Sequence, residues 1–146
     1  MLPAADVPPG EGDEWRSSVL DPAIAHALTQ DLPPAIFRRI LETFEADVAR
    51  LTAQLVAAAA MLDADGFRRA AHSLAGAAAS VGAVLLEQSA RQAMAPTAEP
   101  DRGVAARIQA QGAMAVQALA ALATRQSEGS EAWPAAASGP GSLGAS

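Results

Sequence analysis

The residues best suited to chemistry in this 146-residue chain surround His72, in the stretch FRRAAHSLAGAAASVG that covers residues 67–82. Histidine is largely neutral near neutral pH, and its ring nitrogens are good nucleophiles. On a helix, Arg68 and Arg69 share the face of His72 one turn earlier, and guanidinium groups bind anionic oxygens well. The stretch therefore combines a nucleophile with two cationic side chains on one face of a helix.

The apolar spacing predicts that this stretch is a helix with His72 on its exposed side. At about 100° per residue, one stripe of the helix collects the residues that most need burial. These are Phe67, Ala71, Leu74, Ala78 and Val81. Leu74 lies about 200° round from His72, so the histidine faces solvent. Glycine costs a helix about 1 kcal/mol relative to alanine, so Gly76 indicates a close approach, either by another helix of this chain or by a partner.

The string HSLAGAAASVG, which begins at His72, resembles the signature of histidine phosphotransfer (HPt) domains. In that family the pattern is a histidine, any residue, leucine, lysine, glycine, small residues and a glycine six positions further on. The resemblance implies that His72 carries a phosphoryl group and that Gly76 lets a receiver domain approach it. The chain departs from the pattern at Ala75, where the family usually has lysine. Arg68 and Arg69 are long enough to supply part of the missing positive charge.

The resemblance implies a phosphorelay intermediate in the cytoplasm rather than a free-standing enzyme. His72 would exchange a phosphoryl group with the aspartate of a response-regulator receiver domain, and a hybrid histidine kinase is the other expected partner. In related domains the receiver supplies Mg²⁺, so we expect no cofactor and no metal ion held by this chain. The residues expected to contact the partner are Arg68, Arg69, Ala75, Gly76 and Ala79.

The composition favours closely packed helices and excludes several kinds of site. Half of the residues are hydrophobic, but only five are aromatic (two Trp and three Phe), whereas β-rich folds are enriched in aromatic and β-branched residues. A net charge of −6 argues against a nucleic-acid binder. The lack of cysteine excludes disulfides and thiol catalysis. The longest uncharged apolar run, residues 74–86, falls short of the roughly 18 residues that suggest a membrane span, and no signal peptide is visible.

Start and stop signals predict an all-α fold. Asp21-Pro22 and Pro33-Pro34 are helix starts, and short polar breaks separate the later helices. The expected helices cover residues 22–30, 33–62, 64–81, 83–95 and 101–125. The inward stripe expected for the second helix is Ile36, Ile40, Phe44, Val48, Leu51, Leu55 and Leu62. The short links predict an antiparallel up-and-down four-helix bundle with a short additional N-terminal helix.

The composition also divides the chain. We expect a flexible N-terminal segment over residues 1–20, the bundle over 21–126 and a disordered tail over 127–146, where Gly, Ser and Pro are frequent. We expect a monomer. Two other functions are possible: a module of the same fold that binds a receiver or kinase without passing phosphate, and a helical dimerisation module that buries His72 against a second copy. An enzyme with its own pocket is least favoured, because no acid/base pair or glycine-rich phosphate loop is visible.

Overall fold

The described part of the chain is all-helical, which confirms the predicted fold class. The structure, a computed structural model, describes residues 19–138 and the side chains of residues 19–128. Its helices are α2 (Pro22–Gln30), α3 (Pro34–Ala60), α4 (Ala64–Ser80), α5 (Val84–Ala93) and α6 (Arg102–Ser138). Within these residues the only β-type pairing is an isolated antiparallel bridge between Leu20 and Ala83.

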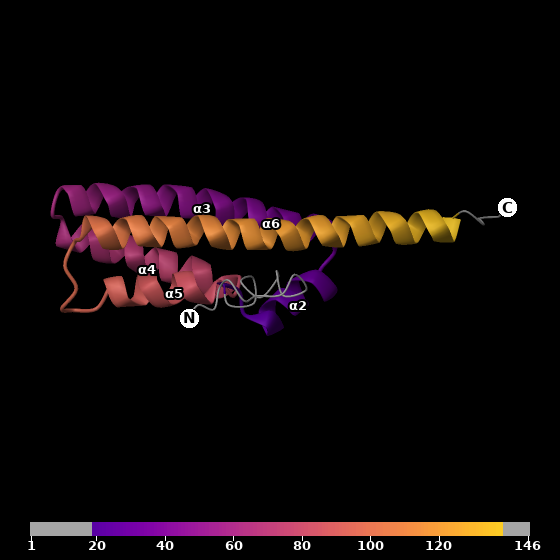
Figure 1. The fold of residues 1–146 in the computed structure, drawn as a ribbon, viewed down its shortest axis with the longest axis horizontal. Helices are drawn as coiled ribbons and strands as arrows, with labels where there is room; N and C mark the ends of the chain where they lie inside the picture. Colours follow the sequence, from indigo (N-terminus) through magenta and orange to yellow (C-terminus); the bar gives the residue numbers. More distant parts are fainter. Residues whose placement is uncertain (1–18, 139–146) are drawn as a thin grey trace, which may run out of the picture.

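Four helices surround one apolar core. α3 packs against α4 and α6, and α5 closes the other side by packing against α4 and α6. Figure 1 shows these four helices lying along a common long axis. The largest fully buried side chains come from all four and include Phe37, Leu55, Phe67, Leu74, Leu86, Ile108 and Leu119. Because each such side chain contributes roughly 1.5–3 kcal/mol on burial, they fix the helices relative to one another.

Local sequence signals position the helix starts. The Asp21 carboxylate accepts a hydrogen bond of 2.9 Å from the backbone N–H of Ala23. The Asp63 carboxylate accepts one of the same length from the N–H of Gly66. Each bond satisfies a donor that has no partner within the first turn of a helix. The predicted starts of α2 and α4 are therefore confirmed.

α3 and α4 end in the same backbone pattern with different residues at the turn. Gly82 follows α4 with a φ of 72°, and Leu62 follows α3 with a φ of 56°. In both cases the next N–H donates to a carbonyl of the last helical turn, at 2.9 Å. Glycine adopts this left-handed conformation freely, whereas leucine rarely does. The prediction that Leu62 faces inward is wrong, because the helix has already ended there and the residue is 76% exposed.

The first turn of α3 is rotated relative to the predicted stripe. Ile36, which was expected inward, is 42% exposed, whereas Phe37 is fully buried. Phe37 lies seven residues before the buried Phe44, so both fall on one face of the helix. Ile40 is partly buried at the edge of that face. The rest of the predicted stripe is buried, namely Val48, Leu51 and Leu55.

The structure corrects the N-terminal boundary of the bundle. Val19 and Leu20, expected in the flexible segment, are each 2% exposed and belong to the core. The N–H of Asp21 donates to the carbonyl of Gly82 at 2.7 Å, which ties this segment to the end of α4. The bundle therefore includes residues 19 and 20. The remainder of the predicted flexible segment, residues 1–18, lies outside the described residues.

The structure also corrects the end of the last helix, which does not stop at residue 125. The Gln126 side-chain amide donates to the carbonyls of Thr29 and Leu32, at 2.7 and 3.2 Å. Arg38 donates to the Ser127 hydroxyl at 3.1 Å. These contacts hold α6 against the link between α2 and α3, so the helix continues where composition alone predicted a disordered tail. Figure 1 shows α6 extending past the other helices. The last eight residues of the chain lie outside the described part.

Candidate functional site

His72 lies in the middle of α4 with its side chain exposed, as predicted. The opposite side of the helix is buried throughout. The predicted seam of Phe67, Ala71, Leu74, Ala78 and Val81 is at most 2% exposed. Because the seam is held in the core, the orientation of α4 keeps the imidazole in solvent, where a partner can reach its ring nitrogens.

Gly76 leaves the surface beside His72 bare. A Cβ built on Gly76 would have no atom of another described residue within 4 Å, so the packing of α4 against the described helices does not require a glycine here. For the helices that the structure describes, the alternative that Gly76 serves close helix packing within the chain is therefore wrong. Side chains on a helix lean toward its N-terminus, so a larger residue at position 76 would lean over His72. The glycine keeps the imidazole uncovered.

The two alanines predicted on the exposed face differ in burial. Ala79 is partly exposed, but Ala75 is only 4% exposed. Ala75 lies about 40° from Ala71 and about 60° from His72 on the helix, at the edge of the buried stripe. Ala75 therefore belongs to the core with the rest of that stripe. The prediction that Ala75 belongs to the exposed face is therefore wrong.

Arg68 and Arg69 flank His72 one turn before it. Arg68 is partly buried, whereas Arg69 is exposed and faces the groove between α3 and α4. Neither guanidinium makes a hydrogen bond or ion pair with another described residue. Each guanidinium has five donors and no acceptor. Both groups are therefore available to an anion bound at the histidine.

Two grooves lie along the line of contact between α3 and α4, and the sequence analysis predicted neither. The first has a volume of about 380 Å³ and is called the Ile36 groove; it is lined by Ile36, Arg39, Ile40, Thr43, Phe44, Ser80 and Val81. The second, of about 460 Å³, is called the Met61 groove; its lining includes Arg50, Leu51, Ala58, Met61, Arg69 and Ser73. The sequence signal that could have indicated them is the set of apolar residues on α3 outside its buried stripe. Whether such residues line a groove depends on where α4 packs, which the sequence does not show. The Met61 groove reaches Ser73, the residue after His72.

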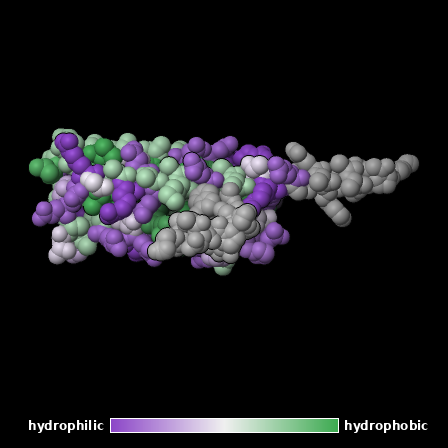
Figure 2. All heavy atoms as spheres, viewed as in Figure 1, coloured by the Kyte–Doolittle hydropathy of each residue, from purple (hydrophilic) through white to green (hydrophobic). Residues whose placement is uncertain are grey.

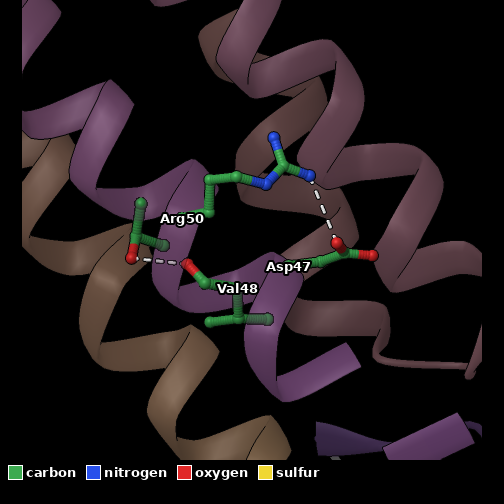
Figure 3. Close-up of polar contacts among 4 residues, drawn as sticks. Asp47, Val48 and Arg50 are labelled. Atoms are coloured by element: carbon green, nitrogen blue, oxygen red, sulfur yellow. Dashed lines mark hydrogen bonds and ion pairs between the residues drawn. The ribbon is translucent and has the colours of Figure 1, made fainter. Parts of the chain in front are cut away.

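The wall that α3 contributes carries one charged pair. Arg50 Nη2 lies 3.2 Å from Asp47 Oδ1 (Figure 3). Both side chains are more than a third exposed, so water screens the pair and it contributes little to stability. In the same turn the buried hydroxyl of Thr52 donates to the Val48 carbonyl at 2.7 Å, which satisfies it within the helix. Arg50 therefore keeps donors for a further anion.

The described residues offer few other candidate sites. No group of three or more His, Cys, Asp or Glu side chains among them is arranged to hold a metal ion. None of their helices is both long enough and apolar enough to cross a membrane. The second histidine, His26, is exposed on α2, away from α4. Within residues 19–128, His72 is therefore the histidine that combines exposure, flanking arginines and a bare neighbouring surface.

Comparison with known proteins gives one finding. A family model described as the Hpt domain matches residues 39–138. The matched range holds most of α3 and all of α4, α5 and α6. It therefore contains His72, the whole lining of the Met61 groove and the lining of the Ile36 groove except Ile36 itself. No curated protein and no solved structure matches the chain.

Proposed function

Because this chain belongs to the Hpt domain family, whose members are phosphotransfer modules of two-component signalling rather than classical enzymes, we propose that it is a phosphorelay intermediate that carries its phosphoryl group on His72. A ring nitrogen of His72 attacks the phosphorus of an aspartyl phosphate on a receiver domain. The nitrogen–phosphorus bond forms, the bond to the aspartate oxygen breaks, and the carboxylate leaves. The reverse reaction passes the group on. The exposed imidazole beside the bare surface of Gly76 supports this proposal most directly.

The chain contributes a positioned nucleophile and two cations. Its imidazole is held on a rigid helix, which lowers the entropic cost of reaching the transition state. Phosphohistidine carries negative charge, and the position where relatives have lysine is the buried Ala75. Arg68 and Arg69 take the cationic role instead, because they are one turn away and have no other partner among the described residues. The receiver supplies Mg²⁺, so the chain itself needs no cofactor.

The proposed docking face is the exposed side of α4 together with the Ile36 groove. It combines Arg68, Arg69, Gly76 and Ala79 with the apolar floor of that groove, which would remove apolar surface of the receiver from water. We propose further that α3–α6 form an antiparallel up-and-down four-helix bundle with α2 as an additional helix. In this proposal the protein acts as a cytoplasmic monomer.

The test is phosphate uptake from the phosphorylated receivers and hybrid kinases of the same organism. We expect the wild-type chain to accept label in a linkage that is labile to acid and stable to base. His72→Gln should accept none while keeping its helical content, because the residue is exposed. His26→Gln is the matched control and should behave as wild type. Label that persists on His72→Gln, or that moves to His26, would contradict the assignment.

A second candidate function is a module of the same fold that does not transfer phosphate. The observation in its favour is Ala75, which stands where the family usually has lysine. A receiver or kinase would then bind the α4 face without transferring phosphate. This candidate replaces the first if wild type binds a receiver but takes label from none. Sedimentation checks the dimerisation alternative, which requires a dimer with His72 buried in the interface.

A further inference from the structure

The turn between α3 and α4 exposes two large apolar side chains that the proposed phosphotransfer does not use. Met61 is 78% exposed and Leu62 is 76% exposed, and Figure 2 shows hydrophobic surface at the same end of the molecule. Leu62 also has the left-handed φ of 56°, where glycine or asparagine would be less strained. In the isolated chain, both side chains therefore expose apolar surface to water, and Leu62 also has an unfavourable backbone conformation. Contact with another molecule would give both residues a role.

The exposed turn opens into the Met61 groove. Met61 lines the groove at one end, and Ser73 lines it at the other, beside His72. The floor between them is apolar and includes Leu51, Ala58 and Ala70. The groove spans about ten residues of the α4 region, or roughly 15 Å at 1.5 Å per residue. A furrow of this length between two packed helices fits a third helix of about three turns.

The charges of the groove point to a carboxylate-bearing occupant. Arg50 on α3 and Arg69 on α4 line opposite walls. Arg69 has no partner among the described residues, and Arg50 contacts Asp47 through a single exposed pair. Asp63 is the acidic residue of the lining, and its side chain already accepts the N–H of Gly66. Two guanidinium groups over an apolar floor contrast with the chain's net charge of −6, and they favour acidic ligands.

We propose that the Met61 groove binds an acidic amphipathic helix of a partner protein. Its apolar residues, spaced three and four apart, pack on the groove floor and on Met61, and its carboxylates bind Arg50 and Arg69. Met61 suits this use because its flexible thioether adapts to different apolar surfaces. The site adjoins the His72 face but is separate from the Ile36 groove. The Met61 groove shares Arg69 with the proposed docking face. Binding requires neither His72 nor phosphate, so it can be measured independently of phosphotransfer.

The test uses a fluorescent helical peptide of about 15 residues, with leucines three and four apart and glutamates on the flanks of that stripe. The control peptide has lysine in place of every glutamate. We expect the full chain to bind the acidic peptide at least about tenfold more tightly than the basic one, as followed by fluorescence anisotropy. The double variant Arg50→Gln, Arg69→Gln should lose this preference.

A second pair of variants locates the site. Met61→Ser with Leu62→Asn should weaken the acidic peptide at least about tenfold and should fold normally, because asparagine tolerates the left-handed conformation. Ile36→Ser and His72→Gln should bind like wild type, and the His72→Gln result separates this proposal from phosphotransfer. The proposal is overturned if the acidic peptide does not bind, if both peptides bind equally, or if Ile36→Ser is the variant that loses binding. Binding to vesicles of anionic lipid that depends on Met61 and Leu62 would instead assign the turn to a membrane surface.

Discussion

Gly76 on α4 and Gly112 on α6 interrupt alanine-rich helices in opposite surroundings. In the described part of the chain, a Cβ built on Gly76 meets nothing within 4 Å, whereas one built on Gly112 would lie 2.7 Å from Cγ1 of Val48 on α3. Each glycine costs its helix about 1 kcal/mol relative to alanine. At Gly112 the close contact of α3 with α6 offsets that cost. At Gly76 nothing within the described chain offsets it.

The two glycines therefore have different roles, one in the fold and one at the candidate functional site. Gly112 serves the packing of two long helices, and its value should appear in folding stability. Gly76 serves the open surface around His72, and its value should appear in phosphotransfer. A substitution at Gly112 should therefore change folding stability, whereas a substitution at Gly76 should change phosphotransfer. The predictions below test this difference.

The largest expected effect is that of Gly76→Gln on phosphotransfer. The longer side chain leans over His72 and obstructs the receiver, so we expect the initial transfer rate to fall by about 100-fold, or about 2.8 kcal/mol in activation free energy. Urea unfolding should show equal or slightly higher stability, because glutamine is the better helix former. Ala106→Gln, at an exposed alanine of α6, is the control and should leave both measurements unchanged. Normal transfer by Gly76→Gln would place the docking surface elsewhere.

Gly112→Ala should act on stability instead. The added methyl group overlaps Val48, whose β-branched side chain has little rotamer freedom, and overpacking of this kind costs about 1–3 kcal/mol. After the gain in helix propensity, we expect a net loss of about 1–2 kcal/mol in the free energy of unfolding. Transfer by the folded protein should be normal.

The double variant Gly112→Ala, Val48→Ala tests the cause of that loss. If the clash with Val48 is responsible, the two substitutions should be less destabilising together than the sum of the single effects. Simple additivity would mean that the glycine has another role.

Removing both arginines beside His72 should give a smaller loss of transfer. We expect Arg68→Gln with Arg69→Gln to slow transfer by about tenfold, since water weakens charge-assisted hydrogen bonds at an exposed site. The loss should shrink at high salt. The control is Arg107→Gln, at an exposed arginine of α6.

The same comparison decides whether the arginines replace the missing lysine. Ala75→Lys should change transfer only slightly if they do, and it should reduce stability because the Cβ at that position is buried. Faster transfer by Ala75→Lys together with a normal arginine double variant would show that the natural chain is a weakened phosphotransfer module.

The smallest expected effect is that of Gly76→Ala. A methyl group fits the open space, so stability should rise by up to about 1 kcal/mol, opposite in sign to Gly112→Ala. Transfer should stay within a few-fold of wild type because the methyl group is short. Thermal unfolding of the two alanine variants side by side measures the contrast. A loss of stability at both positions would remove the distinction drawn between them.

The sequence by itself determined the helices and the orientation of α4. Capping aspartates, prolines and the left-handed Gly82 act within a few residues, so the pattern located most helix ends to within two or three residues. The buried stripe opposite His72 contains five apolar residues, which is enough to determine the exposed side of the helix. Sequence also singled out Gly76, because a glycine among alanines is a local departure that needs a cause.

Only the tertiary structure decided which residues at the edges of each stripe are buried. Periodicity gives the centre of a buried face but not its width, and the width depends on where neighbouring helices pack. Ala75, at the edge of the α4 stripe, is buried, and on α3 it is Phe37 that is buried while Ile36 is exposed. Gln126 and Ser127 contact residues about 90 to 100 positions earlier in the chain, and α6 continues beyond the predicted end at residue 125. Such contacts join segments far apart in the chain, and no local pattern of residues contains them.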